Sequence, residues 1–237
     1  NLKMSTDNPK GYENPDLLWT PAQLKERMGD PNLRIIDTRP GEKFAMGHIP
    51  NARHFNVYGI NCDDSDEAPL MSFMRMWASL LGQRGVAFED TIVFYDDTTG
   101  NTCVRGFWFL ELFGHKDVHV LDGGLDAWTR AGLETTQDAE TPSPAAFNFK
   151  LELDRIATHK DVLAAIDDDN HILLDTRTEG EWQGTTARAK RGGAIPGATW
   201  QEWTQHLTPE GEMKPADELR RQFEAIGITP EKQVTAY

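Results

Sequence analysis

The chain contains the same ordered set of short motifs twice. In each half, an apolar segment ending in Asp-Thr-Arg is followed by a Gly-x-Ile-Pro block and then by a second apolar segment ending in Tyr. The motifs lie at 35–39, 47–52 and 92–95 in the first half, and at 173–177, 193–198 and 234–237 in the second. Equivalent positions are offset by 138 residues at the Asp-Thr-Arg motif, 146 at the Ile-Pro pair and 142 at the final Tyr. Because the order is unchanged and only short insertions separate the motifs, the chain is predicted to be a duplicated domain.

Each copy is expected to start with a helix and continue into a strand. Thr20, Pro21 and Gln23 form the start signal of a helix that runs to about Met28, and Thr158 begins the matching helix of the second copy. Further strands are predicted near 33–36, 92–95 and 118–121, with helices at about 72–81 and 102–113. This alternation favours an α/β fold with two tandem domains, each a mostly parallel sheet flanked by helices.

The repeat also sets the expected domain boundaries. The first copy is assigned to residues 1–137, the polar and proline-bearing stretch 138–149 is predicted to be a semi-extended linker, and the second copy begins at 150 and includes Tyr237. Tyr237 is equivalent to Tyr95, whereas the first copy continues to about Gln137. We therefore expect the second copy to continue for about 40 residues beyond Tyr237.

Composition excludes several classes of partner and cofactor. A hydrophobic content of 38% and a charged content of 26% are typical of a soluble globular protein, and no apolar run is long enough to span a bilayer. The net charge of −14 disfavours nucleic acid and anionic membrane surfaces as partners. Two cysteines are too few for a disulfide framework, and no cluster has metal-ligand or phosphate-loop spacing, so no cofactor is expected. These features leave the compartment open between cytoplasm and periplasm.

The motifs resemble those of the two-domain rhodaneses, sulfurtransferases of the thiosulfate and 3-mercaptopyruvate type. The resemblance rests on the repeated Asp-Thr-Arg strand end, the Gly-x-Ile-Pro blocks and the segment Leu-Asp-Gly-Gly-Leu-Asp-Ala-Trp at 121–128. It implies that the first domain is an inactive copy and that the second supplies a catalytic cysteine directly after a strand like 233–237. Asp96 then occupies the nucleophile position of the inactive copy, and a cysteine is expected immediately after Tyr237.

Sulfur transfer needs a thiolate nucleophile that holds the transferred sulfur as a persulfide. A thiol at a strand end, on a loop leading into a helix N-terminus, has its pKa lowered by backbone N–H groups and by the helix dipole. The Asp96 carboxylate can satisfy the same N–H groups but cannot carry sulfur. Cys103 is expected inside a helix as a small buried hydrophobe, and Cys62 lies in an acidic loop that suppresses thiol reactivity.

Three residues of the second copy are candidates for substrate binding. Arg177 could pair with an anionic donor or bond to Asp175 and fix the loop. Glu181 departs from the arginine that many family members carry four residues after this point; it could orient Arg177 or a loop donor, or be an ordinary solvated carboxylate. The resemblance places Trp203 near the active loop, and core packing is the alternative for this residue.

The stretch 184–192 is an insertion of the second copy and carries a local cluster of positive charge at Arg188, Lys190 and Arg191. This cluster could guide anions or be a solvated loop. Neither alternative is decided by the sequence.

Three functions are consistent with these features. The leading interpretation is an enzyme that moves a sulfane sulfur from thiosulfate, a small anionic donor, to a thiophilic acceptor such as cyanide through a cysteine persulfide, with 3-mercaptopyruvate as the alternative donor. A non-catalytic rhodanese-like binding or regulatory module is the second. A phosphatase of related fold is the third, and it would need a longer nucleophile loop than residues 97–101 provide.

Overall fold

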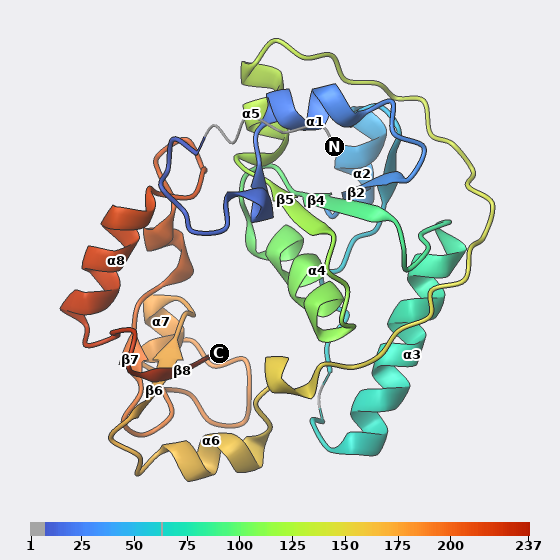
Figure 1. Ribbon diagram of the computed structural model, residues 1–237. Helices are drawn as coiled ribbons and strands as arrows, with labels where there is room; N and C mark the ends of the chain where they lie inside the picture. Colours follow the sequence, from blue (N-terminus) through green and yellow to red (C-terminus); the bar gives the residue numbers. More distant parts are fainter. Residues whose placement is uncertain (1–7, 63) are drawn as a thin grey trace. The chain divides into compact units, whose positions relative to one another are not determined.

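The computed structural model describes residues 8–62 and 64–237, which form two compact units (Figure 1). The five-stranded unit consists of Asn14–Ile156 together with Pro209–Met213. Of the described residues, the three-stranded unit contains 8–13, Ala157–Thr208 and Lys214–Tyr237. In the described part of the chain, no helix combines the length and the apolar character that crossing a membrane requires.

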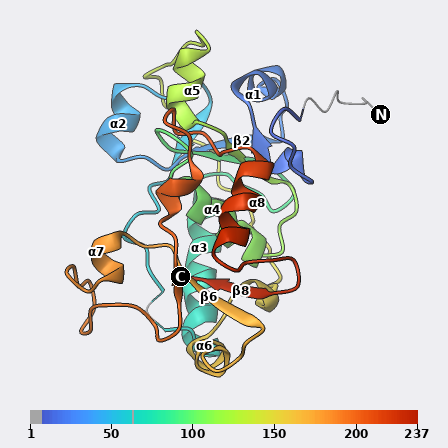
Figure 2. The same cartoon turned by 90° about the vertical axis from the view of Figure 1, so that its left-hand side faces the viewer.

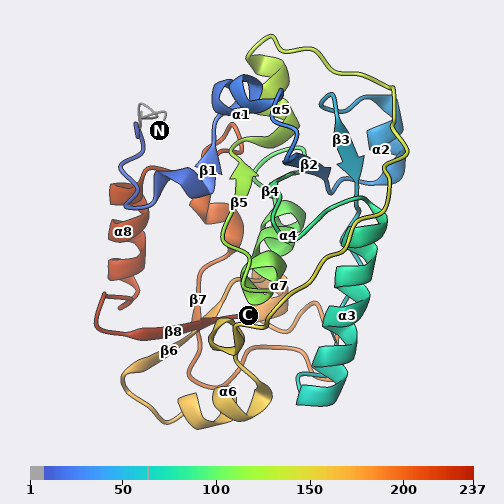
Figure 3. The ribbon, with the colours of Figure 1, turned by 45° about the vertical axis from the view of Figure 1, so that its right-hand side comes forward.

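The sheet of the five-stranded unit is entirely parallel and has the order β1-β5-β4-β2-β3 (Figure 3). Its strands are β1 (Leu18–Trp19), β2 (Leu33–Asp37), β3 (Ala52–His54), β4 (Thr91–Tyr95) and β5 (Val118–Leu121). Its helices are α1 (Pro21–Arg27), α2 (Gly41–Met46), α3 (Glu67–Gln83), α4 (Asn101–Leu112) and α5 (Gly124–Arg130), with 3-10 turns η1 (Pro15–Leu17) and η2 (Leu153–Arg155). The α/β prediction for this half is confirmed.

Alternation along the central strand separates two apolar cores. In β4, Ile92 and Phe94 pack with side chains of α3 and α4, whereas Val93 and Tyr95 pack on the opposite face with those of α1 and α5. All of β4 is buried, as expected for a parallel strand with helices on both faces. The helix predicted at 20–28 is confirmed, since Thr20 and Gln23 form a capping box at its start.

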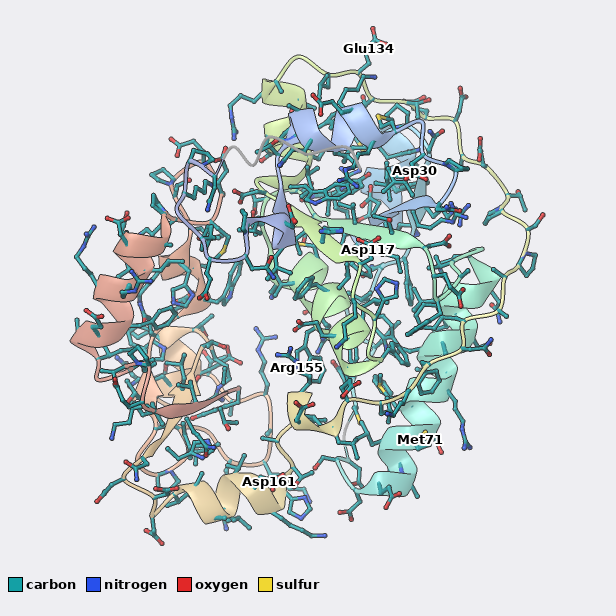
Figure 4. All side chains as sticks on the ribbon, in the orientation of Figure 1. Asp30, Met71, Asp117, Glu134, Arg155 and Asp161 are labelled. Carbon is teal, nitrogen blue, oxygen red and sulfur yellow. The ribbon has the colours of Figure 1, made fainter. Side chains whose placement is uncertain are left out.

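The three-stranded unit has a parallel sheet of order β7-β6-β8, of which Figure 2 labels β6 and β8. Its strands are β6 (His171–Asp175), β7 (Thr199–Trp200) and β8 (Gln233–Ala236). Its helices are α6 (His159–Ala165), α7 (Glu179–Trp182) and α8 (Ala216–Ala225), with the 3-10 turn η3 (Trp203–His206). Asp161 on the first turn of α6 closes a capping box with Thr158, the predicted start of that helix (Figure 4).

The strand registers of the two sheets are equivalent position by position. In the first sheet Asp37 lies opposite His54 and Tyr95, and in the second Asp175 lies opposite Trp200. Leu174 lies opposite Ala236, one residue before Tyr237. These pairs reproduce the offsets of 138, 146 and 142 residues in the sequence. The predicted duplication is therefore present as structure.

The segment expected as a linker, 138–149, is extended but packs on the five-stranded unit. The Ala145 amide donates to the Gly82 carbonyl at 2.8 Å, and Phe147 is buried in the core beside Phe113. The division between the units falls at Ile156 and Ala157, because the aromatic side chains of this segment are part of the first core. The expected boundaries at 137 and 150 lie upstream of that division.

Candidate active site

A hydrogen-bonded network joins the end of β8 to the loop after β6. Arg177 donates from Nε to Oδ1 of Asp175 (3.0 Å) and from Nη2 to Oδ2 (2.5 Å). The same Nη2 donates to the Gly193 carbonyl (3.0 Å). The Tyr237 hydroxyl accepts from the Ile195 amide (3.0 Å) and donates to the Asp175 carboxylate. This Asp-Arg-Tyr network fixes the Gly-x-Ile-Pro block beside the end of β8.

The protonation states in this network follow from burial and pairing. Burial alone would raise the pKa of Asp175, but hydrogen bonds from Arg177 and Tyr237 more than offset it, so this pKa lies below its usual value. The hydrogen bond to Asp175 raises the pKa of Arg177, and burial raises that of Tyr237. At neutral pH the network thus consists of one ion pair and a neutral phenol.

The first copy contains the same network. Arg39 donates to Asp37 from Nε (3.0 Å) and Nη2 (2.6 Å), and its Nη2 also donates to the Gly47 carbonyl (2.7 Å). The Tyr95 hydroxyl donates to Asp37 (2.5 Å) and accepts from the Ile49 amide (3.2 Å). Two chemically identical networks at equivalent strand ends show that the network belongs to the fold and does not by itself require a nucleophile.

Threonines attach both strand ends to the next loop. Thr38 donates from its amide (3.0 Å) and hydroxyl (2.9 Å) to the Tyr95 carbonyl, and Thr176 does the same to the Tyr237 carbonyl (3.0 and 2.9 Å). The Trp203 amide in turn donates to the Thr176 carbonyl at 3.0 Å. Trp203 is half-buried. Through Thr176, its backbone is joined by two hydrogen bonds to the carbonyl of Tyr237.

In the first copy, the residue directly after β4 is Asp96, and its carboxylate is bonded by the loop that leads into α4. Oδ1 of Asp96 accepts from the Asp97 amide (2.7 Å), and Oδ2 accepts from the Thr102 hydroxyl. Gly100 leaves room for this carboxylate, since a Cβ there would lie 2.8 Å from Oδ2. An anion at this position thus receives donors from its own loop and from the first turn of the following helix.

Two cations of the first copy face the next residue of that loop. Lys43 on α2 pairs with Asp97, and Nη1 of Arg39 lies 3.6 Å from Oδ1 of the same carboxylate. The hydrogen bond to Asp97 raises the pKa of Lys43. The side chain four residues after the network arginine therefore points toward the loop that follows the strand.

A short segment from later in the chain packs on the same loop. The Thr99 amide donates to the Gly211 carbonyl (2.9 Å), and the Met213 amide donates to Asp122 (2.8 Å). Gly211 has a φ of +77°, and a Cβ there would lie 2.4 Å from Thr98, so only glycine fits. The loop of the first copy is therefore held by contacts within the five-stranded unit.

Glu181 is neither solvated nor bonded to Arg177. It is buried, caps α7 by accepting from the Thr178 hydroxyl (2.8 Å) and amide (3.3 Å), and pairs through Oε1 with Nε of Arg188 (3.1 Å). The hydrogen bond from Thr178 is the main reason that the pKa of Glu181 is lowered. The structure thus joins the insertion 184–192 to α7 through an ion pair.

The two cysteines lie away from strand ends. Cys103 is fully buried in α4 and donates from Sγ to the Gly100 carbonyl (3.0 Å), and burial raises the pKa of its thiol. The prediction of a small buried residue is confirmed for Cys103. Cys62 is exposed in its loop. Within the described ranges, no three His, Cys, Asp or Glu side chains are grouped to hold a metal ion.

Comparison with known proteins identifies the family. The family model described as "Rhodanese-like domain" matches residues 20–131. A thiosulfate sulfurtransferase from Pseudomonas aeruginosa is 30% identical over 93% of this chain and 82% of its own length. The chain belongs to the rhodanese family. A mouse 3-mercaptopyruvate sulfurtransferase is 28% identical over 92% of this chain and 78% of its own. The crystal structure of SseA from Escherichia coli, a 3-mercaptopyruvate sulfotransferase with the rhodanese fold, superposes with a TM-score of 0.82 and 26% identity, covering 93% of this chain and 87% of the other.

Sulfur transfer is therefore the class of activity of this rhodanese. Sequence reasoning singled out Arg177, Glu181 and Trp203 but did not foresee the roles of the tyrosine hydroxyl or of the Gly193 carbonyl. A signal for the first was present, because Tyr95 and Tyr237 occupy equivalent positions in the repeat. The Gly193 carbonyl is a backbone group, so its role cannot be predicted from the type of residue at that position.

Proposed function

We propose that this rhodanese moves a sulfane sulfur from thiosulfate to a thiophilic acceptor such as cyanide, through a persulfide on a cysteine directly after Tyr237. The observation that carries the proposal is the common register of β4 on β2 and of β8 on β6. The residue after Tyr237 is equivalent to Asp96, whose carboxylate accepts hydrogen bonds from the loop and helix that follow β4.

The chemistry at that position divides into two displacements. The thiolate attacks the outer sulfur of thiosulfate, the S–S bond of the donor breaks, and sulfite leaves with the bonding electron pair. The carbon of cyanide then attacks the outer sulfur of the persulfide, the S–S bond breaks toward the cysteine sulfur, and thiocyanate leaves. The thiolate is regenerated, and no external oxidant or reductant is needed.

The first copy supports the loop environment that this thiolate needs. Asp96 accepts from a backbone amide of its loop and from Thr102 on the first turn of α4. Donors of this kind stabilise a thiolate and lower its pKa, so that it is the reactive form at neutral pH. In the second copy the Asp-Arg-Tyr network and Thr176 hold the end of β8 as their counterparts hold β4.

Arg177 and Trp203 have complementary parts in this proposal. Nε and Nη2 of Arg177 are engaged by Asp175 and Gly193, and Nη1 is the atom that in Arg39 faces the loop after the strand. Arg177 thus orients the strand end and offers its remaining edge to the anionic donor. The Trp203 amide donates to the Thr176 carbonyl, and in this proposal its apolar side chain lies beside the donor.

The alternative donor is 3-mercaptopyruvate, from which the thiolate would take the sulfur while the C–S bond breaks and the carbon is protonated to give pyruvate. Relatives named for both donors are similar to this chain. The ratio of kcat/KM for the two donors decides between them. We expect thiosulfate to be preferred, and a ratio in favour of 3-mercaptopyruvate would reverse the assignment.

The enzymatic proposal as a whole is tested by replacing the residue after Tyr237 in the full-length protein. Substituting that cysteine by serine should abolish turnover of both donors while the folded structure is retained, as judged by circular dichroism. Turnover that survives, or another residue type at that position, would contradict the proposal and favour a non-catalytic module. Cys103→Ser is the matched control.

A further inference from the structure

We propose that Gln201 is a positioning residue, whose side-chain oxygen accepts a hydrogen bond from the loop that carries the nucleophile and so holds the thiolate in line with the donor sulfur. This inference rests on the proposed function, in which the residue after Tyr237 is a cysteine. It assigns a role to a position at which the two copies have side chains of different chemistry.

The hydrogen-bonded ladder of the second sheet continues one residue beyond its strands. The Gln201 amide donates to the Asp175 carbonyl at 3.0 Å. The Thr176 amide donates to the Tyr237 carbonyl, also at 3.0 Å. Gln201, Thr176 and the residue after Tyr237 therefore lie side by side in one row, with Thr176 in the middle. Side chains in one row of a sheet point to the same face.

The equivalent row of the first copy identifies that face. Its members are Phe55, Thr38 and Asp96. Phe55 packs in the core formed with side chains of α3 and α4. Oγ1 of Thr38 lies 3.0 Å from Oγ1 of Thr102 on α4, and the Thr102 hydroxyl donates to Asp96. The row thus faces the helix that follows the nucleophile position, and the repeat places Gln201 on the same face.

The buried oxygen of Gln201 distinguishes the two rows. Phe55 needs no polar partner, whereas Gln201 is 5% exposed and no group in the described ranges donates to its Oε1. A buried amide oxygen without a donor is unfavourable, because it has lost its hydrogen bonds to water. The loop after the strand is a source of donors: in the first copy these are the Asp97 amide and the Thr102 hydroxyl.

The spacing of the strands places the loop within reach. Neighbouring strands lie about 4.8 Å apart, so the Cα atoms of Gln201 and of the residue after Tyr237 are roughly 10 Å apart. The Gln201 carboxamide lies at the end of a long side chain in that interval. Its hydrogen bond fixes the loop against the sheet, and a nucleophile misplaced by about 1 Å can react about 100-fold more slowly. Gln201 therefore affects the rate of sulfur transfer and not the affinity for the donor.

The test measures the burst of sulfite that thiosulfate releases from the full-length protein without cyanide. The burst amplitude counts the working cysteines, so a misfolded fraction lowers the amplitude and leaves the rate constant unchanged. Gln201→Met retains the side-chain volume and removes the acceptor. It should lower the burst rate constant roughly fivefold to tenfold and lower Tm, while the thiosulfate concentration that gives half the maximal rate stays within about twofold. An oxygen without a donor predicts the opposite, a raised Tm and an unchanged rate constant.

Gln222→Met is the matched control. Oε1 of Gln222 is also buried without a donor in the described part of the chain, but Gln222 lies on α8 and outside the row. Its replacement should leave the burst rate constant within about twofold. An equal decrease in the two variants would overturn the inference, because the effect would then be general to buried amides of this unit.

Hydrogen exchange tests the contact without reference to turnover. Amides of the peptide that follows Tyr237 should exchange roughly fivefold to tenfold faster in Gln201→Met than in the unaltered protein. Gln201→Glu keeps an acceptor oxygen of the same reach, whether ionised or not, and should restore part of the protection. An unchanged burst rate constant or unchanged loop exchange in Gln201→Met would overturn the inference alone. No sulfite burst from the unaltered full-length protein would overturn the proposed function and this inference together.

Discussion

The ends of β4 and β8 have the same hydrogen bonds in different surroundings. Both tyrosines donate to the aspartate of the neighbouring strand and accept from an Ile amide, and both arginines bridge that aspartate to a glycine carbonyl. The geometry of the network is therefore the same in both copies, and the two strand ends differ in the residues that surround it.

The comparison also separates geometry from chemistry. Around the first strand end, Arg39 pairs with Asp37 and Asp97, Lys43 pairs with Asp97, and the residue after the strand is the carboxylate Asp96. In the second copy, Arg177 pairs with Asp175, and Glu181, four residues on, pairs with Arg188. Both copies have thus retained the network, whereas the charge four residues after its arginine has changed sign from Lys43 to Glu181.

The largest expected effect is a difference in the free energy of unfolding between Asp37→Ala and Asp175→Ala. Removing Asp37 leaves Arg39, whose side chain is 4% exposed, buried without its partner, and should lower the free energy of unfolding by about 3–5 kcal/mol. In the chain of residues 1–237, on which both variants are measured, Arg177 is 32% exposed, so water can solvate it and the loss should be about 1–2 kcal/mol. Denaturant unfolding gives the totals, and hydrogen exchange in β4 and β8 peptides assigns each loss to its sheet. Equal losses would contradict the difference in burial.

The second comparison exchanges the network arginines. Arg177→Ala should lower Tm and raise the donor KM roughly tenfold, and Arg177→Lys should recover only part of the affinity, because a point charge replaces a planar fork. Arg39→Lys, the matched control, should lower Tm and leave the donor KM unchanged. A lowered Tm with an unchanged KM in Arg177→Ala would remove the donor-binding role and leave a structural one.

A smaller effect concerns pH and one histidine in each unit. Burial lowers the pKa of His115 in the five-stranded unit and of His206 in the three-stranded unit, with nearby Lys214 adding to the effect at His206. Because these imidazoles are neutral when folded, their stabilising contribution is present above the ordinary histidine pKa of about 6.5 and is lost as the pH falls from there toward the lowered pKa. Unfolding measured between pH 7 and 5 should show decreasing stability, with a shallower slope in His115→Gln and His206→Gln. A pH-independent stability in the unaltered protein would refute this.

The smallest effect is expected at the two cysteines. Cys103→Ser preserves a donor to the Gly100 carbonyl and Cys62→Ser changes an exposed side chain, so kcat for sulfur transfer should stay within about twofold in both. Steady-state assays with thiosulfate and cyanide measure this. Loss of turnover in Cys103→Ser with the fold preserved would mean that the nucleophile has been misplaced.

The sequence was sufficient for the features that depend on local pattern and on repetition. The capping box at Thr20, the buried strand at 91–95 and the register of Tyr95 with Tyr237 all follow from residue order. What it could not predict depends on contacts between distant segments. The docking of Gly211 on Thr99 and the burial of Phe147 in the first core have no local signal.

In the candidate site, too, local interactions were among the predictions, whereas a contact made by the insertion was not. Bonding of Arg177 to Asp175 was one of the two alternatives that the sequence left open, and the two side chains are bonded. A loop donor was one of the alternatives for Glu181, but its identity as Arg188 was not predictable, because it is set by how the insertion 184–192 folds back on α7. An insertion has no counterpart in the first copy from which its course could be inferred.

The central claim is that the second strand end presents the sulfur-accepting nucleophile and that the first presents a carboxylate in its place. Incubating the full-length protein with thiosulfate, removing excess donor and mapping peptides by mass spectrometry tests this directly. The account predicts a gain of the mass of one sulfur atom on the peptide that contains Tyr237, at the residue following it, and its loss on addition of cyanide. A persulfide on Cys103 or Cys62, or no cyanide-labile sulfur on any peptide, would contradict it.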